Sequence, residues 1–251
     1  HPVNPQNVGT SLPEAVRLWA DMSLTCEMLT VEPDLIDPSS ADSVAIYEAA
    51  AEAGIPLVKT GFFNYLPGDD YWQKVADARR ALEGFVRLGE RTGVKTIYQN
   101  HSGNCLGSNR AGLMHLIQGF DPNWIGVYVD GGHMAIDGED VEMGLAMCKG
   151  YLTVIGAKDA RDIPDERPDA PAPYGSAFVF LGQGAAHWPR LLRTAKASGF
   201  DGPISVGTEY TEDQKVMFTV GGKDLSDQAA SRREVGLVED LRFLRREWVR
   251  V

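Results

Sequence analysis

The chain has 251 residues, of which 43% are hydrophobic and 24% charged, values typical of a folded globular domain rather than of a disordered or fibrous sequence. Its formal net charge of -11 would repel nucleic-acid phosphates and anionic membrane surfaces, and no block of basic residues offsets it. No apolar run approaches the roughly 18 residues of a membrane span. We therefore expect a single soluble domain over residues 1–251, with no nucleic-acid or membrane partner.

The three cysteines, Cys26, Cys105 and Cys148, are widely spaced and form no CxxC pair. Buried, reduced thiols are therefore expected rather than a disulfide or a metal site. The chain begins with His1 rather than Met, and no basic-then-apolar leader follows. We expect a cytoplasmic protein whose natural N-terminus lies before His1.

Helical and strand-like patterns alternate along the chain. The first helix is predicted over residues 12–24, with Ser11 as its cap and Pro13 near its first turn. Further helices are predicted over 42–53, 71–92, 109–120, 139–149, 186–198 and 226–248, and strands over 26–31, 57–63, 94–100, 124–129, 151–157 and 203–207. Strands separated by helices imply βαβ units and a parallel sheet.

Polar residues follow several of the predicted strands, as at His101, Asp130 and Glu209. In a parallel β/α barrel the carboxyl ends of the strands meet on one face, where the loops supply the chemistry. An open doubly wound sheet is the alternative, but no predicted strand leads into a Gly-rich phosphate turn. The predicted strands are fewer than the about eight of a closed barrel, so we expect the others to precede His1. Residues 159–176 predict a long loop that could cover the pocket.

Five segments carry recognisable motifs at these strand ends. They are 98–103 (Tyr-Gln-Asn-His-Ser-Gly), 130–133 (Asp-Gly-Gly-His), 157–159 (Ala-Lys-Asp), 181–184 (Leu-Gly-Gln-Gly) and 202–206 (Gly-Pro-Ile-Ser-Val). Together they resemble the xylose isomerase-like TIM barrels, which include sugar-phosphate isomerases and epimerases, ketose 3-epimerases and inosose dehydratases. The resemblance implies an α/β fold, a parallel (β/α)8 TIM barrel with N-terminal strands missing from this sequence.

The resemblance also implies one divalent metal (Mn, Mg or Zn) bound by Glu, Asp, His and Glu at four strand ends. These positions align with Gln99, Asp130, Gly156 and Gly207. Only Asp130 keeps a strong ligand, because glycine has no side-chain donor and a neutral amide binds more weakly than a carboxylate. We expect no metal cofactor; a remodelled metal site would use Asp130, His133 and Glu209.

Side chains two residues apart on a strand face the same way, so His101, Lys158 and Glu209 should share the side of the former ligand positions. Proton removal alpha to a carbonyl needs a base and a positive group for the developing enediolate. Lys158 could supply the charge, Glu209 or Asp130 the base, and a histidine the proton donor. The candidate catalytic residues are Lys158, Glu209, Asp130 and His101, and the candidate substrate-binding residues are Gln99, His133 and Lys59.

Each of these candidates has a structural alternative. His101 could anchor its loop, and Asp130 could pair with His133 to fix the turn between them. Lys158 and Asp159 could form a surface salt bridge, and Glu209 could lie in a solvated loop.

These residues and the resemblance favour an isomerase or epimerase that acts on a sugar, keto-sugar or polyol derivative by proton transfer alpha to a carbonyl. Two alternatives stay open: a non-catalytic sugar-binding barrel, and a lyase or dehydratase of keto-sugars. Endonuclease action on abasic DNA, known among related barrels, is disfavoured because it needs a metal-rich site and a basic face. The expected partner is a small carbohydrate, and the resemblance suggests a homo-oligomer.

Overall fold

The computed structural model describes residues 4–31, 35–165, 168, 172–210 and 227–251. The chain divides into two compact units, which we describe separately. The first comprises His1–Gln99, Gly103–Gly107 and Ala111–Tyr128, and the second comprises Asn100–Ser102, Ser108–Arg110 and Val129–Val251. The expectation of a single domain stays a prediction.

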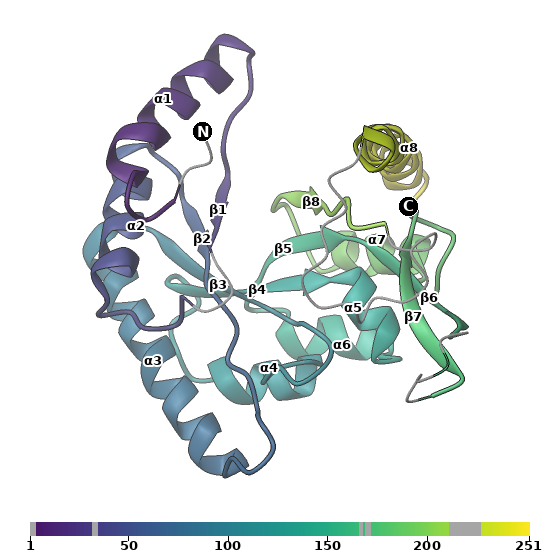
Figure 1. Ribbon diagram of the computed structural model, residues 1–251, viewed down its shortest axis with the longest axis horizontal. Coiled ribbons are helices and arrows are strands. Elements are labelled where there is room, and N and C mark those ends of the chain that lie inside the picture. The colour runs from purple at the N-terminus through teal and green to yellow at the C-terminus, as the bar shows by residue number, and fades with distance from the viewer. Residues whose placement is uncertain (1–3, 32–34, 166–167, 169–171, 211–226) are drawn as a thin grey trace. The chain divides into compact units, whose positions relative to one another are not determined.

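Helices and strands alternate in the first unit (Figure 1). In chain order they are α1 (Val8–Asp21), β1 (Met28–Thr30), α2 (Ala41–Glu52), β2 (Leu57–Lys59), α3 (Tyr71–Thr92) and β3 (Lys95–Gln99). The three strands pair in parallel, β1 with β2 and β2 with β3. Helix α1 packs on α2, and α2 packs on α3. The helices and strand β2 together bury an apolar core that includes Leu12, Tyr47, Val58 and Phe85.

Local signals set the ends of α2 and α3. The Ser40 side chain accepts a hydrogen bond from the Ser43 N–H at the start of α2, and Asp70 accepts one from the Gln73 N–H at the start of α3. These bonds satisfy backbone donors that have no partner within the helix. Helix α3 ends at Gly93, whose φ of 76° lies in the left-handed region that glycine adopts without strain. Its predicted bounds, 71–92, are confirmed.

Helix α1 begins four residues earlier than the sequence indicates, at Val8 rather than after a Ser11 cap. Asn4 and Asn7 form a tight turn in front of it, with each side-chain oxygen accepting a backbone N–H of the other residue. Pro13 consequently lies inside the helix. The prediction was wrong because proline was taken as a start signal, whereas the asparagine turn begins the helix.

Helix α4 (Arg110–Ile117) and strand β4 (Ile125–Asp130) contribute to both units. Strand β4 pairs in parallel with β3 through its first residues. The principal sheet has six strands in the order β1-β2-β3-β4-β5-β8, the same six segments that the sequence predicts.

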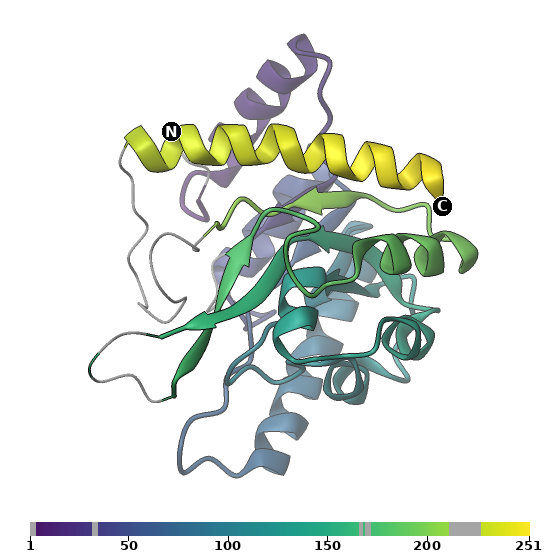
Figure 2. The ribbon, with the colours of Figure 1, turned by 90° about the vertical axis from the view of Figure 1, so that its right-hand side faces the viewer.

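The second unit holds the remaining elements (Figure 2). They are α5 (Gly131–Ile136), α6 (Val141–Cys148), β5 (Leu152–Ala157), β6 (Asp159–Pro164), β7 (Tyr174–Val179), α7 (Trp188–Ala197), β8 (Ile204–Val206) and α8 (Asp227–Arg250). Strands β5 and β8 pair in parallel, and α8 runs beside α7 and β8. The predicted start of this last helix at Ser226 lies outside the described residues.

Two features of this unit differ from prediction. The segment predicted as a long loop over 159–176 forms the antiparallel hairpin of β6 and β7, whose first strand packs on α5. The short helix α5 was not predicted at all, because a six-residue helix opening with Gly131 and Gly132 has no periodic apolar pattern.

The three cysteines are free thiols, Cys148 buried and the other two half-buried. Within the described residues, no helix is long and apolar enough to cross a membrane.

Candidate functional site

Asp130 ends β4 and begins α5, and its carboxylate is fully buried. Its Oδ1 accepts the backbone N–H groups of Gly132 (3.0 Å) and His133 (3.1 Å), which caps the helix. Asn100 holds the backbone of Asp130 from the other side, accepting its N–H at 2.8 Å and donating to its carbonyl at 3.3 Å. The position of this carboxylate is therefore set by both its side chain and its main chain.

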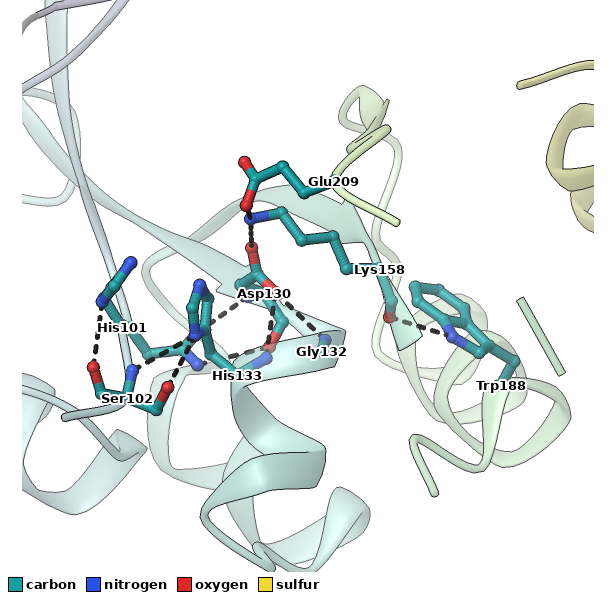
Figure 3. Close-up of polar contacts among 9 residues, drawn as sticks. His101, Ser102, Asp130, Gly132, His133, Lys158, Trp188 and Glu209 are labelled. Carbon is teal, nitrogen blue, oxygen red and sulfur yellow. Dashed lines mark hydrogen bonds and ion pairs between the residues drawn. The ribbon is translucent and has the colours of Figure 1, made fainter. Parts of the chain in front are cut away.

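Lys158 follows β5 and brings its ammonium to two carboxylates (Figure 3). Its Nζ lies 3.4 Å from Asp130 Oδ2 and 3.2 Å from Glu209 Oε2. The Lys158 and Asp130 side chains are 8% and 0% exposed, whereas that of Glu209 is 62% exposed. A cation between two carboxylates is favoured in its charged form. The three candidates Lys158, Asp130 and Glu209 thus form one charged cluster, open to solvent on the side of Glu209.

The rest of Lys158 is also fixed. The indole Nε1 of Trp188 donates to the Lys158 carbonyl oxygen at 3.2 Å, and the Phe178 ring centroid lies 5.1 Å from Nζ. Trp188 itself is buried against Gly131, where a Cβ atom would come within 2.6 Å of the indole. The ammonium is therefore held at a defined point rather than on a free stem.

Asp159, the next residue, turns away from this cluster and organises a loop. Its carboxylate accepts backbone N–H groups from Ala160 (2.9 Å), Gly182 (2.9 Å), Gly184 (3.1 Å) and Ala186 (3.0 Å). Burial raises the pKa of this carboxyl, and the four N–H donors act in the opposite direction. Since Lys158 and Asp159 are both buried and have different partners, the alternative of a surface salt bridge between them was wrong.

The rings of His101 and His133 lie against each other at a tilt of 37°, with their centroids 3.9 Å apart. His133 Nδ1 accepts the backbone N–H of Ser102 at 3.3 Å and lies 2.9 Å from the Ser102 hydroxyl. Because a backbone N–H only donates, we assign the neutral tautomer of His133 with its proton on Nε2. His101 Nδ1 lies 3.0 Å from the Ser102 carbonyl oxygen, so the loop-anchoring alternative also describes part of its role.

The predicted pairing of Asp130 with His133 takes another form. The carboxylate binds the backbone N–H of His133, while the imidazole bonds to Ser102. Asp130 therefore combines the predicted structural role with its place in the charged cluster.

Lys59 and Gln99 belong to the first unit. Both are buried, at 5% exposure each. The Lys59 Nζ donates to the Thr60 carbonyl oxygen at 3.1 Å and lies 4.2 Å from the centroid of Phe62. Gln99 is the last residue of β3, one residue before the predicted end of that strand at Asn100. Their proposed contacts with substrate stay predictions.

A third buried carboxylate, that of Asp240, supports the segment that carries Glu209. Asp240 on α8 accepts the Leu181 N–H at 2.8 Å and the Tyr210 hydroxyl at 2.7 Å. Burial raises the pKa of both Asp240 and Tyr210. The Tyr210 ring packs edge-on against Phe180 at 4.6 Å. This arrangement fixes the residue that follows Glu209.

Sequence reasoning missed several residues that build the site. Asn100 was part of a recognised motif but was not given a role, and its spacing alone could not show that it holds Asp130. Ser102 and Phe178 had no signal, because their contacts with His133 and Lys158 arise only in the folded chain. Trp188 lies in the core and makes one hydrogen bond to the site.

The residues around Asp130 do not fit a divalent metal. In the parts of the chain that the structure describes, no three His, Cys, Asp or Glu side chains are grouped so as to hold one, and this applies to the remodelled set of Asp130, His133 and Glu209. Asp130 uses one oxygen for backbone N–H groups and directs the other at an ammonium. A metal ligand must instead direct its lone pairs at the ion.

Comparisons with known proteins agree with this fold. A sequence profile described as "Xylose isomerase-like TIM barrel" matches residues 24–247. The structure is similar to that of a D-tagatose 3-epimerase-like protein, with 17% identity, a TM-score of 0.65, and coverage of 96% of this chain and 86% of the other. It is also similar to D-allulose 3-epimerase from Methylomonas sp. (14%, TM-score 0.66, 97% and 84%).

A third similar structure is a xylose isomerase-like TIM barrel protein from Mycobacterium smegmatis in complex with magnesium (18% identity, TM-score 0.61, 91% of this chain and 78% of the other). Comparison with curated proteins finds no match. At these identities the structural likeness shows the fold alone. The predicted α/β TIM-barrel fold is confirmed, and the open doubly wound alternative was wrong.

Proposed function

Because the chain belongs to the xylose isomerase-like TIM barrel family, we propose that it is a sugar isomerase or epimerase that moves a proton alpha to the carbonyl of a keto-sugar or related polyol derivative. The observation that carries the proposal is the Lys158 ammonium between the carboxylates of Asp130 and Glu209. Sugar epimerases among the similar structures support the substrate class.

Removing a proton next to a carbonyl leaves negative charge on the carbonyl oxygen. A cation placed beside that oxygen lowers the barrier, because it stabilises charge that develops only in the transition state. Lys158 meets this requirement, since its ammonium is fixed and 8% exposed. Little water surrounds it, so its field is screened less than that of a surface lysine.

The two carboxylates have different surroundings and suit different roles. Asp130 is fully buried, accepts two backbone N–H groups through one oxygen and faces the ammonium with the other, so it suits the role of the partner that holds Lys158. Glu209 is 62% exposed, so a substrate can approach it. We assign Glu209 as the base that takes the alpha proton, and His133 or His101 as the donor that returns or orients one.

The proposal is tested by incubating the protein with a panel of keto-sugars in D2O and following deuterium incorporation by NMR. Lys158→Met should reduce exchange by at least about 100-fold, the effect of losing one preorganised electrostatic group. Lys149→Met is the matched control, because Lys149 is an exposed lysine after α6 in the same unit. Full exchange activity in Lys158→Met would refute the assignment.

The same assay separates the alternatives. Sugar binding without exchange in any member of the panel would favour a non-catalytic sugar-binding barrel. Exchange accompanied by loss of water from the sugar would favour a dehydratase, because both reactions begin with the same proton transfer.

A further inference from the structure

Two glycines and an aromatic ring surround the side chain of Lys158. We call this arrangement the lysine slot, formed by Gly132, Phe178 and Gly207. A Cβ atom on Gly207 would come within 2.6 Å of Lys158 Cε and 2.7 Å of its Cγ. A Cβ atom on Gly132 would come within 2.7 Å of Lys158 Cβ and 3.0 Å of the Phe178 ring. The observed position of the Lys158 stem therefore requires that both positions lack a side chain.

The backbone conformation at position 207 does not require a glycine. Its φ lies outside the left-handed region, where glycine is favoured for conformational reasons. Its close neighbours are all atoms of the Lys158 stem, which can bend away. The space at this position thus serves the lysine and not the local fold.

The slot delivers a positive charge to the carboxylates of Asp130 and Glu209. Both distances, 3.4 Å and 3.2 Å, put the ammonium where a cation bound by these carboxylates would lie. A divalent ion entering this space would meet a fixed like charge, so it could bind only if the lysine left.

We infer that the Lys158 ammonium is the built-in cation of this site, that it excludes a divalent metal from Asp130 and Glu209, and that Gly207 is the positioning residue that admits it. One part of this inference rests on the proposed function, namely that the Lys158 ammonium lies beside the substrate oxygen during catalysis. The cation preference of the site is independent of any substrate, and it can be measured on the protein alone.

The first experiment measures Mn2+ binding to the full chain by electron paramagnetic resonance. Wild type and the control Lys149→Ala should bind no stoichiometric Mn2+ at this site, and Lys158→Ala should bind one ion at least about tenfold more tightly, because a like charge is removed from between two carboxylates. Adding Asp130→Asn to Lys158→Ala should abolish the gain. One tightly bound Mn2+ in wild type that Asp130→Asn removes, or no gain in Lys158→Ala, would overturn the inference.

The second experiment follows the lysine itself and does not depend on the folding of Lys158→Ala. In protein with 13C-labelled lysine, the ε-methylene signal of Lys158 should carry a ring-current shift, because Nζ lies 5.1 Å from the Phe178 centroid. Gly207→Ala should move this signal, since the new Cβ displaces the stem. Gly150→Ala is the matched control, because nothing lies within 4 Å of its added Cβ and its backbone is equally permissive. An unchanged signal in Gly207→Ala would refute the role of Gly207.

The two proposals can fail separately. Absence of sugar exchange, with Mn2+ binding only to Lys158→Ala, would refute the proposed function and leave the built-in cation standing. Exchange that requires added metal in wild type would refute the built-in cation and leave the proposed function standing.

Discussion

Replacing Asp159 by alanine should lower the free energy of unfolding by about 4.5 kcal/mol. The carboxylate is 1% exposed and binds three backbone N–H groups of the loop before α7, those of Gly182, Gly184 and Ala186. Hydrogen bonds to a charged group contribute about 1.5–3 kcal/mol each. Burial opposes them, as the raised pKa of Asp159 indicates, so the net loss should lie toward the lower end of their combined contribution.

The measurement is urea unfolding at pH 7. Asp201→Ala is the control, because Asp201 is exposed and surface substitutions usually change stability by no more than about 0.5 kcal/mol. Asp159→Asn keeps one acceptor oxygen and should lose about half as much as alanine. A loss under about 1 kcal/mol for Asp159→Ala would refute the reasoning, since the loop would then satisfy its N–H groups without this carboxylate.

The dependence of this effect on pH has a defined sign. The pKa of Asp159 is raised in the folded protein, so the folded state holds its proton more tightly than the unfolded state. The stability that Asp159 gains from this tighter proton binding is fully present below the ordinary pKa of aspartate. It is lost as the pH rises through the pKa that Asp159 has in the folded protein. The stability difference between wild type and Asp159→Asn should therefore shrink as pH rises above about 4. A difference that grows with pH would contradict the assignment.

Three further predictions concern the second unit. Arg110 is fully buried and pairs with Glu139 at 3.0 Å. In urea unfolding, Arg110→Met combined with Glu139→Leu should change stability by at most about 1 kcal/mol, whereas Glu139→Gln alone should lower it by about 3 kcal/mol because it leaves a buried charge unpaired; the reverse order would contradict this. Tyr210→Phe should cost about 1–2 kcal/mol in the same assay, because Asp240 loses its hydroxyl donor. Burial raises the pKa of Asp137 to about 6, so its charge opposes folding above that pH. Asp137→Asn should therefore stabilise by about 1 kcal/mol or less at pH 8 and leave stability at pH 4 unchanged, after allowing for solvent screening at this exposed residue.

The regular elements of the parallel sheet could be predicted because their signals are local. Helix α3 has an aspartate cap, a left-handed glycine after its last turn, and a buried face at helical spacing. The β6–β7 hairpin could not be found in the same way. Its first strand contains charged residues and a proline with no apolar alternation, and its pairing joins residues that are from about ten to about twenty positions apart in the chain.

The site was partly predictable for a geometric reason. Lys158 and Glu209 each lie two residues beyond a former ligand position, and alternation along a strand predicts that they face the same side. The ion pairs that join them to Asp130 match that expectation. The spacing of residues in the sequence says nothing about distances between strands. It could therefore not show that Trp188 donates a hydrogen bond to the Lys158 carbonyl oxygen, or that the Phe178 ring lies near the Lys158 ammonium.

The space shared by Lys158 and Gly207 also limits the order in which the two positions can change during evolution. A side chain added at 207 while the lysine is present would meet its stem at 2.6 Å. A shorter residue at 158 removes that barrier and makes larger residues at 207 acceptable. Substitution at 158 should therefore come first, and among related sequences a long basic residue at 158 should occur together with glycine at 207. The residue at either position alone is then a poor guide to the ancestry of the site, whereas the combination of residues at 158 and 207 is informative about it.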